Sequence, residues 1–113
     1  MRFYNFGSNN LHRVWDSQII ERYTTDEGEL LGDLKGIATP AFAGESLKGT
    51  PEDWATESLQ VAKKAYCLPG TQNVIHSGTA LGDDYYRMAL PIIQTQLAKT
   101  GVRVAATLNA IFR

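Results

Sequence analysis

The chain has 113 residues, of which 43% are hydrophobic, and a formal net charge of −1 with a pI near 6.1. This length fits one domain with one core, and the charge argues against a protein that holds nucleic acid mainly through a dense basic surface. Cys67 is the single cysteine, which excludes an intrachain disulfide and a cluster of thiolate metal ligands. No apolar run approaches the roughly 20 residues that span a bilayer, and the N-terminus lacks the pattern of a signal peptide.

The first segment predicts an extended arm followed by a helix. Residues 2–6 are rich in strand-prone aromatic side chains, and a turn-forming cluster follows them. Asn9 or Asn10 can cap the helix by accepting a hydrogen bond from its first turn. The apolar side chains that would face the core are Leu11, Val14, Trp15, Ile19, Ile20 and Tyr23. His12 and Asp16 lie beside this stripe, on the flank where a cleft would open.

The middle of the chain predicts two further helices. A capping-box pattern at Thr24 and apolar residues at helical spacing predict a short helix over about 26–36. Residues 38–49 turn to Pro, Gly, Thr and Ser, and they predict the longest loop. Thr50 is a good N-cap and a proline follows it, so we expect a helix from 51 to about 66.

The last third predicts a polar connection and one long helix. The connection spans residues 70–82 and carries His76, which we expect to be an exposed loop histidine because no other ligand stands at metal-binding spacing. From Tyr85 onward one apolar line continues through Ala89, Ile93, Leu97, Val104, Leu108 and Ile111. This favours a single helix in which Gly101 marks a close approach to a neighbouring helix. The alternative is that Gly101 caps the C-terminus of a shorter helix.

His12 and Asp16 form the candidate metal site. Side chains four residues apart on a helix share one face, with roughly 5–6 Å between their Cβ atoms. A nitrogen of His12 and an oxygen of Asp16 could therefore coordinate one zinc ion, each at roughly 2.0–2.2 Å from it. His12 would then be neutral and Asp16 ionised. The alternatives are two solvent-facing helix residues, or a carboxylate that only orients the imidazole.

Four segments together carry a resemblance to a known family. They comprise residues 2–21, 53–58, 85–92 and 96–112, and their most specific patterns are Asn-Leu-His-x-x-Trp-Asp at 10–16 and Gly-x-Arg-x-Ala-x-x-Leu-Asn at 101–109. In these segments the chain resembles the single-strand-specific zinc nucleases, the S-one/P-one family, which belongs with the zinc phospholipases C. The resemblance covers nearly the whole chain.

The resemblance implies an all-α fold of the zinc phospholipase C/nuclease type, here only its C-terminal helices with a short extended N-terminal arm. Residues 1–113 would be the C-terminal portion of a single, incomplete nuclease domain. The family holds three zinc ions, and only its last His-x-x-x-Asp motif is matched here. His12 and Asp16 would supply ligands for one ion, and the missing N-terminal half would supply the rest. No catalytic residue is expected beyond these metal ligands.

The implied activity is that of a zinc-dependent endonuclease, which hydrolyses single-stranded DNA or RNA by attack of a metal-activated hydroxide on phosphorus. This chain alone is expected to be inactive, because catalytic zinc sites normally take three protein ligands. Asn10 could contact a nucleotide or only cap the helix. An aromatic cluster at Phe3, Tyr4 and Phe6 could stack bases or pack in the core. The scattered Lys and Arg side chains are expected to be mostly ordinary solvated charges.

Two other functions stay open. The first is a non-catalytic helical module, in which His12 and Asp16 only hydrogen-bond each other or bind a structural or incidental metal. The second is a phospholipase-type phosphodiesterase, since the superfamily includes lipid hydrolases. Family members are secreted or periplasmic, but the location of this chain is left open because it shows no signal peptide.

Overall fold

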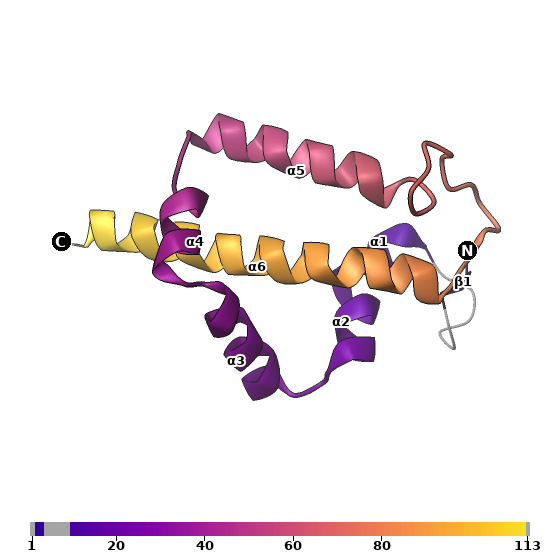
Figure 1. The fold of residues 1–113 in the computed structure, drawn as a ribbon, viewed down its shortest axis with the longest axis horizontal. Helices are drawn as coiled ribbons and strands as arrows, with labels where there is room; N and C mark the ends of the chain where they lie inside the picture. Colours follow the sequence, from indigo (N-terminus) through magenta and orange to yellow (C-terminus); the bar gives the residue numbers. More distant parts are fainter. Residues whose placement is uncertain (1, 4–9, 113) are drawn as a thin grey trace.

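The computed structural model describes residues 2–3 and 10–112. In chain order its elements are β1 (Arg2–Phe3), α1 (Leu11–Arg13), the π-helical turn η2 (Val14–Gln18), α2 (Ile19–Tyr23), α3 (Glu27–Ile37), α4 (Pro40–Ser46), α5 (Pro51–Ala65), β2 (Ala80–Leu81) and α6 (Asp83–Ile111). Figure 1 shows α6 as the spine of the molecule, with α5 on one side and α2 and α3 on the other. The prediction of an all-α fold is confirmed.

The two short strands join the start of the chain to the start of α6. β1 and β2 pair in parallel, with Arg2 opposite Ala80 and Phe3 opposite Leu81. The extended N-terminal arm is therefore confirmed for residues 2–3, whereas residues 4–6 of the predicted arm lie outside the described residues. β2 falls inside the connection that was expected to lack structure. A pairing of two residues leaves no alternation for a sequence pattern to show.

The first helix contains a wide turn that its sequence did not predict. The backbone N–H of Ile19 bonds to the carbonyl of Val14, five residues earlier, instead of four. Both Val14 and Ile19 are fully buried. Five residues of a regular α-helix cover about 1.4 turns, which would point these two side chains in different directions. The wider turn brings both onto the core, so packing outweighs the regular hydrogen-bond pattern.

Helix α4 is a correction to the predicted loop over 38–49. Thr39 caps it by accepting a hydrogen bond from the N–H of Phe42, and Pro40 occupies the first helical position. The same Thr-Pro signal correctly predicted α5, where Thr50 and Asp53 form a capping box. The α4 segment lacks apolar periodicity, which is why its start signal alone did not predict a helix.

Helix α3 lies where it was expected, but a different residue caps it. The carboxylate of Asp26 accepts hydrogen bonds from the N–H groups of Gly28 and Glu29. Thr24 was expected to cap this helix, and instead its hydroxyl donates to the side chain of Glu29. An aspartate at the N-cap also places a negative charge at the positive end of the helix, which stabilises its first turn.

The core lies at one end of the spine. Its buried side chains come from the first helix, the connection before β2, β2 itself and the first half of α6: Val14, Ile19, Ile75, Leu81, Tyr85, Ala89 and Ile93. Ala98 is the last buried residue of α6, whereas Val104, Leu108 and Ile111 are 51%, 48% and 65% exposed. The radius of gyration is 15.7 Å, larger than the roughly 13 Å of a typical 100-residue domain. The second half of α6 is therefore an uncovered apolar helix face.

None of the helices that the structure describes is both long enough and apolar enough to cross a membrane. α6 is the longest, but polar and charged side chains interrupt its apolar line.

Gly101 lies inside α6, so the alternative that it caps a shorter helix is wrong. The expected close approach is also not found in the described part of the chain, because a Cβ built at Gly101 meets nothing within 4 Å. We expect Gly101→Ala to raise the free energy of unfolding by about 0.5–1 kcal/mol, since alanine loses less backbone entropy in a helix. Urea denaturation of the purified chain measures this change.

Gly49→Ala is the matched control, because it should lower the free energy of unfolding instead of raising it. Gly49 has a φ of +86°, and an added Cβ would lie 2.9 Å from a carboxylate oxygen of Asp53. This substitution should destabilise the chain. A loss of stability in Gly101→Ala as well would show that Gly101 packs closely against another segment of the isolated chain.

Candidate metal site

The two predicted ligands lie on the first helical run, where the wide turn separates them. His12 belongs to α1 and Asp16 to η2, and both side chains are exposed. The run is anchored from below by Val14 and Ile19, which are fully buried. His12 and Asp16 are therefore presented to solvent on a segment whose backbone position is set by the core.

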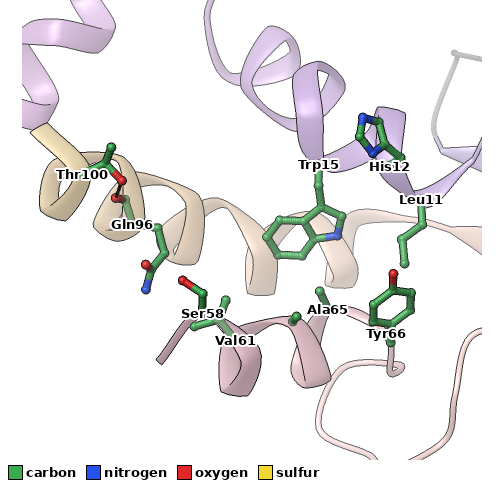
Figure 2. Close-up of a pocket in the computed structure, with 10 residues that line it drawn as sticks. Leu11, His12, Trp15, Ser58, Val61, Ala65, Tyr66, Gln96 and Thr100 are labelled. Atoms are coloured by element: carbon green, nitrogen blue, oxygen red, sulfur yellow. Dashed lines mark hydrogen bonds between the residues drawn. The ribbon is translucent and has the colours of Figure 1, made fainter. Parts of the chain in front are cut away.

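A cavity of about 390 Å³ lies between this run, α5 and α6. Its lining residues are Leu11, His12, Trp15, Ser58, Val61, Ala62, Ala65, Tyr66, Gln96 and Thr100. Figure 2 shows the Trp15 indole reaching into the cavity toward Ala65, while His12 lies at the rim on the side of α1. The structure thus brings His12 to the cavity, but Asp16 is not among the lining residues.

The donor atoms suit one corner of a zinc site. An imidazole nitrogen and a carboxylate oxygen are both common zinc ligands, and exposure makes both reachable by an incoming ion. Within residues 2–3 and 10–112, no group of three or more His, Cys, Asp or Glu side chains is placed to hold a metal. His76 is exposed in the connection between α5 and β2, and its carbonyl accepts hydrogen bonds from Thr79. His12 and Asp16 would therefore need further donors from other residues.

Trp15 connects the candidate ligands to both long helices. Its indole N–H donates to the hydroxyl of Tyr85 at 2.7 Å, and this hydroxyl donates to the carbonyl of Ala65 at the end of α5. The two rings meet edge to face, with centroids 6.1 Å apart and an interplanar angle of 86°. Burial raises the pKa of Tyr85 to about 12, although the hydrogen bond from Trp15 opposes this, so the hydroxyl keeps its proton at neutral pH. The sequence analysis assigned no role to Tyr85.

A second polar cluster joins α4, α5 and α6. One carboxylate oxygen of Glu57 accepts from the Arg103 guanidinium at 2.8 Å, and the other pairs with the ammonium of Lys99. Arg103 also donates from Nε to the carbonyl of Ser46 at 2.9 Å and lies 4.6 Å from the ring centroid of Trp54. The hydrogen bond from Lys99, and then that from Arg103, lower the pKa of Glu57 against the opposing effect of burial. We call Trp54, Glu57, Lys99 and Arg103 the α5/α6 clasp.

The clasp contains two exceptions to the prediction that most Lys and Arg side chains are solvated charges, which holds for most of the others that the structure describes. Arg103 and Lys99 are largely buried, with side-chain exposures of 15% and 24%. Arg22 also has a structural role, because it pairs with Asp83 at 2.9 Å and its guanidinium lies 3.8 Å from the ring centroid of Tyr86. These contacts tie α2 to the first turn of α6.

Asn10 caps α1, because its side-chain oxygen accepts from the N–H of Arg13 at 2.9 Å. This confirms the capping role that the sequence predicted. Its predicted contact with a nucleotide stays a prediction. Phe3, Tyr4 and Phe6 were expected to stack bases or fill the core; only the backbone of Phe3 is described, and Tyr4 and Phe6 lie outside the described residues.

The family model described as S1/P1 Nuclease matches residues 2–113. The chain belongs to this nuclease family. It is 37% identical to Endonuclease 4 of Arabidopsis thaliana over 91% of the chain and 38% of that protein. Endonuclease 2 and Endonuclease 1 of the same plant are 34% and 32% identical, over 91% and 99% of the chain. No solved structure matches the chain.

The chain spans only 38–39% of the length of these three relatives. The core and the candidate ligands gather at one end of α6, whereas Val104, Leu108 and Ile111 near its other end are exposed. The resemblance pointed to the segments that hold Glu57, Tyr85 and Arg103 without showing why these residues matter. Only their contacts in the fold reveal it.

Proposed function

We propose that this chain is part of a zinc-dependent nuclease that hydrolyses phosphodiester bonds of single-stranded DNA or RNA. The observation that carries the proposal is the pair His12 and Asp16, exposed on one anchored helical run in a chain of the S1/P1 nuclease family. The relatives are named endonucleases, which supports a nucleic acid as the substrate. The preference for single strands and the dependence on zinc go beyond what the names of these relatives state.

In this proposal His12 and Asp16 hold one zinc ion from the rim of the cavity. His12 would bind through a neutral ring nitrogen and donate its other N–H to an acceptor that fixes the ring. Asp16 would bind as a carboxylate. Bound zinc lowers the pKa of water, so that hydroxide is present near neutral pH, and stabilises charge on the leaving oxygen. Asn10, exposed two residues before His12, would contact the nucleotide while its side-chain oxygen caps α1.

The remaining ligands would come from the portion of a family-length protein that this chain does not span. Two ligands fall short of the three protein ligands of a typical catalytic zinc site. The chain covers 38% of the length of Endonuclease 4, which leaves ample sequence for more donors. The bare apolar face of α6 beyond Ala98 gives that portion a surface to cover, since large exposed apolar patches mark interaction sites.

Zinc titration of the isolated chain tests the ligand assignment. We expect weak binding near neutral pH, with a dissociation constant above roughly 1 µM, because two ligands leave the coordination shell of the ion open. His12→Ala and Asp16→Ala should each abolish it in titration calorimetry. Matched controls are His76→Ala and Glu21→Ala, which remove an exposed histidine and an exposed carboxylate elsewhere on the chain.

Submicromolar affinity, or affinity unchanged in both ligand variants, would contradict the assignment. The second result would favour the non-catalytic helical module, in which His12 and Asp16 bind no ion. Binding that falls equally in the His76 control would indicate nonspecific association of zinc with histidine.

A further inference from the structure

The Trp15 and Tyr85 side chains form a hydrogen-bonded chain that ends on the helical run of the two candidate ligands. Trp15 lies between His12 and Asp16 in sequence, and its ring lines the cavity that His12 also lines (Figure 2). The N–H of Trp15 donates to the Tyr85 hydroxyl at 2.7 Å, and that hydroxyl donates to the carbonyl of Ala65. Tyr85 is fully buried, so this connection is fixed in the core.

The wide turn changes how the two candidate ligands are placed relative to each other. In an α-helix four residues cover slightly more than one turn. The wide turn at Val14–Gln18 begins between His12 and Asp16, so Asp16 takes a different angle relative to His12 from the one it would have on a regular α-helix. Wide turns of this kind are rare and occur often at functional sites. Burial of Val14 and Ile19 favours this turn, and Trp15, its second residue, adds a side-chain hydrogen bond that can hold it.

We propose that Tyr85 is a positioning residue for the metal site: its hydroxyl holds the Trp15 indole, and through it the wide turn that orients Asp16 relative to His12. This inference rests on the proposed function, since it concerns the same zinc ligands. Tyr85 itself contacts no ligand in this reading and acts only through Trp15.

The chemistry of the hydroxyl suits this role. It donates its one proton to the carbonyl of Ala65 and accepts the N–H of Trp15, so the same hydroxyl acts as donor and acceptor. Its pKa of about 12, raised by burial, keeps that proton in place across the pH range in which zinc is bound. A phenylalanine at position 85 would fill the same volume and lose both bonds. The Trp15 N–H would then be free to turn away.

The test is zinc titration of the 15N-labelled chain, followed by NMR through the amide resonances of residues 12–18 and the indole N–H of Trp15. We expect Tyr85→Phe to weaken zinc binding roughly tenfold, a typical effect of removing a group that orients a metal ligand. The indole resonance should shift, and the amides of the wide turn should exchange faster with solvent. Tyr23→Phe is the matched control, because it removes another part-buried tyrosine hydroxyl, bonded to Asp33, and should leave zinc affinity within about twofold.

Trp15→Phe separates positioning from general stability. It keeps an aromatic ring against Tyr85 but has no N–H to donate, so it should also weaken zinc binding roughly tenfold. The double variant Trp15→Phe/Tyr85→Phe should lose no more than either single variant, since both remove one connection. If Tyr85→Phe fails to fold, the zinc affinity of Trp15→Phe alone tests the inference.

Unchanged zinc affinity in Tyr85→Phe or Trp15→Phe overturns this inference and leaves the proposed function intact. An equal loss in Tyr23→Phe also overturns it, because the loss would then follow general destabilisation. A chain that shows no zinc binding dependent on His12 overturns the proposed function and this inference together.

Discussion

Purified alone, the 113-residue chain is expected to show no zinc-dependent hydrolysis of single-stranded DNA or RNA, and to gain activity when mixed with the N-terminal portion of a relative. Endonuclease 4 of Arabidopsis thaliana suits this experiment, because the chain matches 38% of its length and the remainder can be expressed separately. The expected gain is at least several hundredfold over the separate parts, a modest share of the usual enzymatic rate enhancement of 10⁶-fold or more. Release of acid-soluble nucleotides measures it.

The controls use the same variants as the zinc titration. A mixture that contains His12→Ala should stay inactive, whereas one that contains His76→Ala should match the unaltered chain. A phosphatidylcholine substrate in a parallel reaction tests the lipid alternative. The bare apolar face of α6, where Val104 and Ile111 are 51% and 65% exposed, should also make the lone chain self-associate in light scattering.

Two results would count against this prediction. Robust cleavage by the single chain would mean that His12 and Asp16 work with ligands contributed by a second copy of the chain. A stable monomer that gains nothing from the complementing portion would favour the non-catalytic module.

The second large effect concerns stability, and it is expected at Glu57. Glu57→Gln should lower the free energy of unfolding at pH 7 by about 1–3 kcal/mol, because the charged hydrogen bonds to Lys99 and Arg103 are lost where both partners are largely buried. Glu45→Gln is the matched control. Glu45 pairs with Lys48 at 2.7 Å, but both side chains are 72% exposed, so the loss should stay below about 0.5 kcal/mol.

The stability lost in Glu57→Gln should be smaller at acid pH than at neutral pH. Its pKa in the folded chain lies below the ordinary value of 4.5, so its contribution is fully present above pH 4.5. That contribution is lost as the pH falls through the lowered pKa and the carboxylate takes up a proton. The difference between Glu57→Gln and the unaltered chain should therefore shrink in urea melts as the pH falls below 4.5. A difference that stays constant or grows toward acid would rule out the ion pair as its cause.

The sequence alone determined the features that depend on neighbouring residues. Helix starts at Asn10 and Thr50 were predicted because a cap acts on the backbone within three residues of itself. The continuous α6 followed from one apolar line that passes through Gly101. The motif around His12 and Asp16 was equally local, and it pointed to the family that the comparison confirmed.

Tertiary structure decided what depends on residues far apart in the chain. The wide turn at Val14–Gln18 forms because two side chains five residues apart both gain by burial, which no helical pattern predicts. Tyr85 meets Trp15 across 70 residues, and Arg103 meets Glu57 across 46. Such contacts contribute free energy only after the helices that carry the two residues have come together, so the local sequence around each residue carries no sign of them. The ligand types were therefore readable from the sequence, whereas the contacts that hold their helical run in place arose only from the fold.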